Sequence, residues 1–125
     1  MTETQSQKQE RQIKTNLVSI YGNARTQPGS GNQATAPNDV VVAGIMHVEC
    51  KTTSAKSMTL KHSWIAGAKK LAMQFAVPAY LAIRFDSIES RDYFVIDDGT
   101  FYNLLRIEKE HTALVEELRQ KAKIA

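Results

Sequence analysis

The chain of 125 residues has one cysteine and no long hydrophobic run. A single cysteine, Cys50, excludes an internal disulfide and a zinc site built from several cysteines. No apolar stretch is long enough to span a bilayer, and the N-terminus is polar, unlike a secretion signal. The sequence therefore predicts a cytoplasmic protein without a membrane partner.

The composition is that of an ordinary globular protein, with 42% hydrophobic and 23% charged residues. Its length predicts one domain, residues 1–125, with one core. The net charge of +3 and the sequence pI of about 9.1 suit a polyanionic partner but do not demand one. No internal repeat is visible.

The pattern of apolar residues predicts an α/β protein, with a mixed sheet flanked by helices and a further helix at the C-terminal end. Residues 1–7 are polar and are expected to be disordered. A helix over about 8–21 should end at Gly22, and a loop rich in glycine and small polar residues follows. The other expected elements are strands over 40–42 and 45–48, a polar loop over 51–57, a helix over 60–76 capped by Ser57 or Thr59, strands over 78–85 and 93–96, a turn at 97–99 and a helix over 103–121.

Candidate catalytic residues lie between Asp39 and Lys51. If the two strands form a hairpin that turns near residues 43–44, Asp39 returns beside Glu49. Alternate residues of a strand share a face, so Glu49 and Lys51 point the same way while Cys50 points into the core. Carboxylates and a lysine on one patch are typical of metal-dependent phosphodiester hydrolysis.

Asp39 followed by Glu49-Cys50-Lys51 resembles the signature of the PD-(D/E)XK nucleases. The surrounding order adds to the likeness, because Glu10-Arg11 opens the first helix, Arg25 follows it, and Gly29-Ser30-Gly31 precedes the aspartate. This order resembles the archaeal-type Holliday junction resolvases and their phage-encoded relatives over about residues 8–85. The resemblance implies a restriction-endonuclease-like core and a metal-dependent endodeoxyribonuclease of a bacterium or of a phage-infected host cell.

The resemblance also implies roles for individual residues. Metal ligands would be the side chains of Asp39 and Glu49, the main-chain carbonyl of Cys50 and, as a third acidic ligand, Glu10. They would hold one or two Mg²⁺ ions, or Mn²⁺ in their place, with no small-molecule cofactor. Lys51 would orient the attacking water, and Ser30 would contribute to activity. The residues expected to contact DNA are Arg11, Arg25, Ser30, Lys56 and Lys61.

The substrate implied by the resemblance is branched DNA, above all the four-way junction. Such resolvases act as homodimers, because two opposed strands must be cut together. The last helix carries an apolar stripe suited to docking on the core or on a second subunit, and the region of Trp64 is another candidate for the subunit contact. The stripe consists of Leu104, Ile107, His111, Leu114 and Leu118.

Other interpretations stay open at this stage. Glu10 suits an ordinary solvated helix position, Trp64 suits the core, and His47 is more typical of a packed or solvent-facing histidine than of a ligand. A different substrate, as in a nicking, flap or single-strand nuclease, fits the same motif. A non-catalytic DNA-binding module of the same fold is the alternative outside the enzymes.

Overall fold

A computed structural model of the chain describes residues 2–26 and 39–124 and, at Asp39, the main chain only. The chain divides into two compact units, Met1–Val95 and Ile96–Ala125. No helix of the described residues is both long and apolar enough to cross a membrane. The elements, in order, are α1 (Gln5–Tyr21), β1 (Arg25–Thr26), β2 (Asp39–Val42), β3 (Met46–Thr53), α2 (His62–Phe75), β4 (Ala79–Phe85), β5 (Asp92–Val95) and α3 (Asp98–Ile124).

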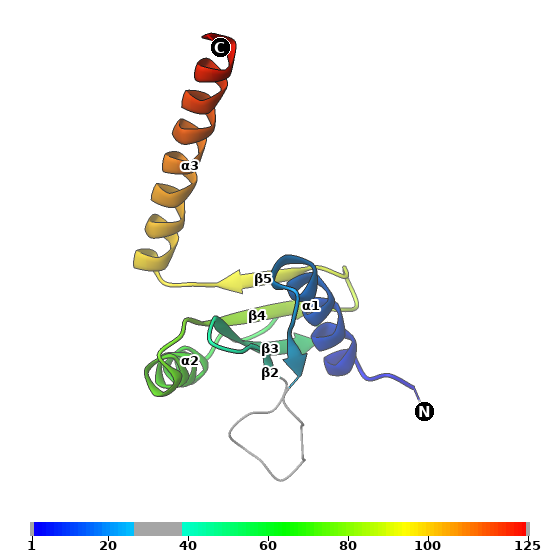
Figure 1. Cartoon of the computed structure of the whole chain (residues 1–125). Coiled ribbons are helices and arrows are strands. Elements are labelled where there is room, and N and C mark those ends of the chain that lie inside the picture. Colours follow the sequence, from blue (N-terminus) through cyan, green and yellow to red (C-terminus); the bar gives the residue numbers. More distant parts are fainter. Residues whose placement is uncertain (1, 27–38, 125) are drawn as a thin grey trace. The chain divides into compact units, whose positions relative to one another are not determined.

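The first unit is built on a five-stranded mixed sheet in the order β1-β2-β3-β4-β5 (Figure 1). β1, β2 and β3 pair antiparallel, β4 runs parallel to β3, and β5 is antiparallel to β4. The parallel pair requires a crossover, which α2 supplies. The predicted α/β class and mixed sheet are confirmed.

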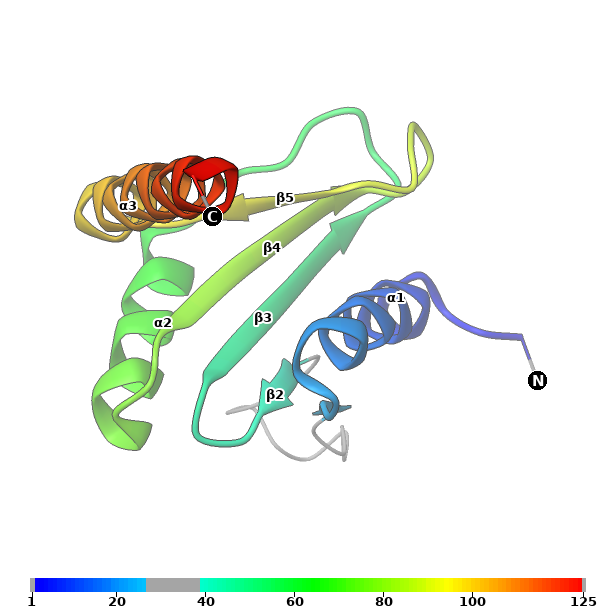
Figure 2. The ribbon, with the colours of Figure 1, turned by 45° about the horizontal axis from the view of Figure 1, so that its top comes forward.

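The two helices of this unit cover opposite faces of the sheet (Figure 2). On one face, Ile13 of α1 packs in a core cluster with Val40, Val48, Cys50 and Ala82. On the other face, α2 lies over β3 and β4. Because β3 is sandwiched between the two helices, its alternate residues reach two different environments.

α1 begins at Gln5, so the predicted disordered end at residues 1–7 is too long. The hydroxyl of Thr4 accepts a hydrogen bond from the Gln7 main-chain N–H, and the Gln7 side chain accepts one in return from the Thr4 N–H. This reciprocal capping satisfies N–H groups that the first turn leaves without helical partners. The helix ends at Gly22 (φ 83°), as predicted.

Two expected boundaries around β3 and α2 are wrong. β3 continues through Thr53, where a polar loop from residue 51 was expected, because Lys51 and Thr53 remain paired with β4. α2 begins after Lys61 without a side-chain cap, so neither Ser57 nor Thr59 has the predicted capping role. Of the residues of α2, Ala68 alone is fully buried.

The second unit contains the single helix α3, which is longer than the predicted 103–121 helix. Asp97 accepts a hydrogen bond from the Thr100 main-chain N–H at 2.7 Å, so it starts the helix where a turn at 97–99 was expected. No residue of α3 is buried in the structure. Its exposed apolar residues include Leu104, Ile107, Leu114 and Leu118.

Candidate metal centre

The hairpin between β2 and β3 sets the register of the candidate site. Asp39 lies directly opposite Glu49 in the antiparallel ladder. The turn lies at the predicted place, where Gly44 adopts φ 72° and the Ile45 N–H donates to the Val42 carbonyl at 2.9 Å. The predicted return of Asp39 beside Glu49 therefore holds for the main chain.

Glu49 and Lys51 share one face of β3, as the alternation predicts. Lys51 Nζ lies 3.3 Å from Glu49 Oε1, and the two side chains are 23% and 17% exposed. Cys50, between them, is buried in the core cluster on the opposite face. The ion pair is thus largely shielded from water.

The face that carries Glu49 and Lys51 is the α2 face. The ring of His47, two residues before Glu49, stacks on Phe75 with centroids 4.7 Å apart. Lys51 Nζ lies 4.9 Å from the ring centroid of Trp64, in the first turn of α2. Both ends of α2 therefore contact this face of β3.

β3 runs past the point where the described part of β2 begins. The His47 N–H donates to the Pro78 carbonyl, and the Thr53 carbonyl accepts from the Asp86 N–H, so both groups point toward the β4 side. Main-chain groups of neighbouring strand residues point to opposite edges. The N–H and carbonyl groups of Cys50 therefore point toward the edge of β3 that pairs with β2. Asp39 is the first residue of β2 on that edge.

α1 is fixed to this part of β3 by a buried amide. Gln9 has no exposed surface, and its Nε2 donates to the Lys51 carbonyl at 3.2 Å, the Ala82 carbonyl at 3.3 Å and Asp92 Oδ1 at 3.0 Å. Glu10 is the next residue and is half-buried. Burial raises the pKa of the Glu10 carboxyl from its ordinary value of 4.5, because a charged group loses hydration there.

Three of the basic residues predicted to contact DNA belong to segments next to the α2 face of β3. Arg25 on β1 pairs in register with Val41, which in turn pairs with His47, so Arg25 is in the same cross-strand row as that histidine. Lys61 Nζ lies 5.9 Å from the Trp64 ring centroid. Lys56 is exposed in the connection between β3 and α2.

Arg11 lies elsewhere. Its guanidinium forms an ion pair with Glu3, with Nε 2.8 Å from Oε2. It also lines an open hollow of about 670 Å³ between α1 and β5, on the α1 face of the sheet. The structure therefore does not bring Arg11 together with Glu49 and Lys51.

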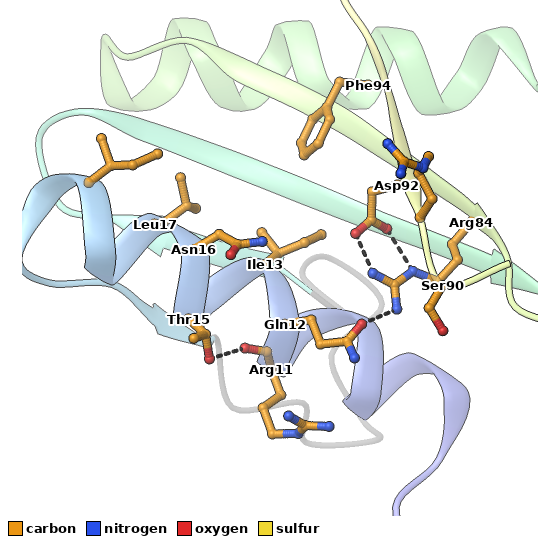
Figure 3. A pocket seen from close by; sticks show the side chains of 12 residues that line it. Arg11, Gln12, Ile13, Thr15, Asn16, Leu17, Arg84, Ser90, Asp92 and Phe94 are labelled. Carbon is orange, nitrogen blue, oxygen red and sulfur yellow. Dashed lines mark hydrogen bonds and ion pairs between the residues drawn. The ribbon is translucent and has the colours of Figure 1, made fainter.

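The floor of this hollow is a buried polar network (Figure 3). The Arg84 guanidinium donates to both carboxylate oxygens of Asp92 and to Oε1 of Gln12, and Arg84 is 2% exposed. Ile13 and Phe94 supply apolar walls. The bidentate pair joins β4 to β5, and the bond from Arg84 to Gln12 ties α1 to them.

Within the described side chains, no three of histidine, cysteine, aspartate and glutamate form a group that could hold a metal ion. That set leaves out two members of the predicted site: the side chain of Asp39 and the whole of Ser30 lie outside the described residues. Comparison with known protein families, curated proteins and solved structures gave no match.

The sequence interpretation missed the environment of Trp64 and the role of Gln9. Trp64 is half-buried and contacts two lysines, where full burial in the core was favoured. The spacing Lys61-x-x-Trp64 was the available signal, because residues three apart on a helix are neighbours. For Gln9, the signal was its position four residues before Ile13, in line with the buried stripe of α1.

Proposed function

We propose that the first unit is a metal-dependent endodeoxyribonuclease with a restriction-endonuclease-like core, and that it cuts branched DNA. The observation that carries the proposal is the geometry around β3. Asp39 is in register with Glu49, and Lys51 contacts Glu49 on the same strand face. An acid–acid–lysine set on a hairpin is the arrangement that the PD-(D/E)XK resemblance implies.

The order of elements supports the same proposal. α1 is followed by three antiparallel strands, and α2 then crosses over to β4, which lies parallel to β3. This is the succession of helix, long hairpin, helix and strand expected of the restriction-nuclease type. Fold alone does not choose a function, so the side chains of the site decide the reaction class.

The donor set fits a hard divalent cation. Its members are carboxylates and a carbonyl, and oxygen ligands of this kind suit Mg²⁺ or Mn²⁺. Glu49 and Asp39 would hold the ion, joined by the Cys50 carbonyl and, from the helix that covers the other face of the sheet, by Glu10. Burial raises the pKa of the Glu10 carboxyl, and a nearby cation would offset the cost of its charge. A bound ion of this type would polarise the phosphate and acidify the attacking water.

Lys51 would orient the water and neutralise charge that builds up on the phosphate. The water oxygen forms a bond to phosphorus, and the bond between phosphorus and the 3′ oxygen breaks. The water proton leaves to solvent, and the 3′ oxygen takes up a proton. The products are a 5′-phosphate and a 3′-hydroxyl.

Branched DNA is the proposed substrate because the order of the motifs resembles that of the Holliday junction resolvases. Phosphate contacts would then dominate affinity, and the shape of a junction would select it. We propose a homodimer that presents two sites to a nearly two-fold symmetric junction. The exposed apolar stripe of α3 is the candidate contact. Light scattering that gives the 14.0 kDa mass of one chain would contradict the dimer.

The test is cleavage of a synthetic four-way junction beside a linear duplex of the same sequence, with Mg²⁺ and with EDTA. We expect paired symmetric nicks in the junction alone, abolished by EDTA. Equal cutting of both substrates would indicate a nuclease with another substrate. Tight junction binding without cutting, in Mg²⁺ and in Mn²⁺, would indicate a non-catalytic binding module.

A further inference from the structure

Trp64 is the only tryptophan of the chain, and it contacts two ammonium groups. Lys51 Nζ lies 4.9 Å from its ring centroid and Lys61 Nζ lies 5.9 Å from it. Both distances are within the range in which an aromatic face attracts a cation. The indole therefore gathers a lysine of β3 and a lysine at the start of α2 at one place.

Lys51 is held from two sides. Glu49 Oε1 contacts its ammonium at 3.3 Å, and the Trp64 ring lies against it from α2. A lysine side chain has a flexible four-carbon stem and loses much rotamer freedom when one position is fixed. A contact from each side reduces the number of positions that the ammonium can occupy before any substrate arrives.

The two contacts to Lys51 respond differently when a metal ion binds to the proposed site. A Glu49 carboxylate that binds a metal ion shares its charge with that ion, so its attraction for Lys51 weakens. The indole is no metal ligand, and its attraction for the ammonium does not depend on the ion. Trp64 is therefore the contact that persists through the reaction.

We propose that Trp64 is a positioning residue for two lysines with separate tasks, and this inference rests on the proposed nuclease function. Lys51 meets the phosphate that is cut, while Lys61, over the same ring, binds a neighbouring phosphate of the DNA strand. The role of Trp64 is to hold both ammonium groups in place without touching the reacting atoms.

Kinetics of three variants test the division of tasks. In Trp64→Leu we expect kcat to fall about tenfold and KM to rise, because Lys51 and Lys61 both lose the cation–π contact that places them. Trp64→Phe keeps an aromatic face and should recover most of this loss. In Lys61→Gln, kcat should stay, KM should rise, and the slope of log affinity against log salt should fall by about one.

A second measurement needs no DNA cleavage. The ring current of Trp64 should shift the ε-methylene protons of Lys51 upfield in the NMR spectrum of the wild-type protein, relative to those of the exposed Lys69 and Lys70. The shift should disappear in Trp64→Leu. Lys51 resonances that match those of Lys69 in the wild type would overturn the inference, even if Trp64→Leu failed to fold.

Different results would overturn the nuclease function and the positioning role of Trp64. A wild-type protein that cuts no DNA would overturn the nuclease function, and the role of Trp64 in it would fall as well. An active wild type with an equally active Trp64→Leu would overturn the positioning role alone. A Trp64→Leu variant that changes KM and leaves kcat untouched would also overturn it, because the indole would then act through Lys61 alone and have no effect on Lys51.

Discussion

The side-chain amide of Gln9 donates to the main-chain carbonyl of Lys51 at 3.2 Å, and this bond ties the first helix to the strand that carries the candidate lysine. The same nitrogen reaches acceptors on β4 and β5. One fully buried side chain thus connects α1 with three strands. Because Glu10 follows Gln9 directly, the amide also fixes the segment of helix that carries the third candidate carboxylate.

Gln9→Leu should destabilise the protein. The leucine has nearly the same volume but leaves the carbonyls of Lys51 and Ala82 without this donor, and a buried acceptor that loses its partner costs about 1–3 kcal/mol. Urea unfolding measures the loss, and Gln5→Leu, at an exposed position of the same helix, is the matched control. Equal stability of the Gln9 variant and the wild type would show that the network adds nothing.

The hairpin could be predicted from the sequence because local rules determine it. Alternation along the strand places Glu49 with Lys51 and sends Cys50 inward, and a glycine at the turn sets the register that brings Asp39 opposite Glu49. These features depend on neighbours within about a dozen residues.

The features that were missed depend on contacts between distant segments. Gln9 looks polar and solvent-exposed until β4 and β5 provide its acceptors. Trp64 looks like a core residue until β3 extends far enough to bring Lys51 against its ring. No local pattern encodes either contact, because each needs the parallel crossover from β3 to β4 to form first.

Asp39→Asn and Glu49→Gln should each abolish Mg²⁺-dependent cleavage while leaving junction binding intact. Each change removes a charged oxygen ligand and keeps the shape of the side chain, so we expect a loss of at least about 100-fold in rate. Cleavage assays and gel-shift binding with the same junction measure the two properties. Glu110→Gln, on exposed α3, is the control. Mg²⁺-dependent cutting by Asp39→Asn at the wild-type rate would contradict the site.

Glu10→Gln should stabilise the metal-free protein at neutral pH. Burial raises the folded-state pKa of Glu10 above its ordinary 4.5, so the stability of the wild type falls as the pH rises through that folded pKa. The neutral amide avoids this cost, and the advantage of the variant should shrink as the pH approaches 4.5. Urea unfolding at pH 4.5 and pH 7.5 in EDTA measures the difference.

Added Mg²⁺ should reverse this order at pH 7.5, because an ion that binds the folded state stabilises it and Glu10 is a proposed ligand. Glu110→Gln again provides the comparison for removal of one exposed carboxylate. A Glu10 variant that gains as much stability from Mg²⁺ as the wild type does would remove Glu10 from the ligand set.

His47 should make the folded protein sensitive to mild acid. Burial, and then the charge of Arg25, lowers its pKa from the ordinary 6.5, and its Nδ1 has no hydrogen-bond partner among the described residues. Above pH 6.5 both folded and unfolded states hold a neutral imidazole. As the pH falls below 6.5, the unfolded state takes up the proton first, so the free energy of unfolding decreases until the folded pKa is passed.

His47→Phe keeps a ring to stack on Phe75 and removes the titration. We expect its free energy of unfolding to change less between pH 7.5 and pH 5.5 than that of the wild type. His62→Gln, at an exposed position that begins α2, should retain the wild-type dependence. Urea unfolding across this range measures all three proteins. If His62→Gln flattened the profile and His47→Phe did not, the acid sensitivity would lie outside the α2 face of β3.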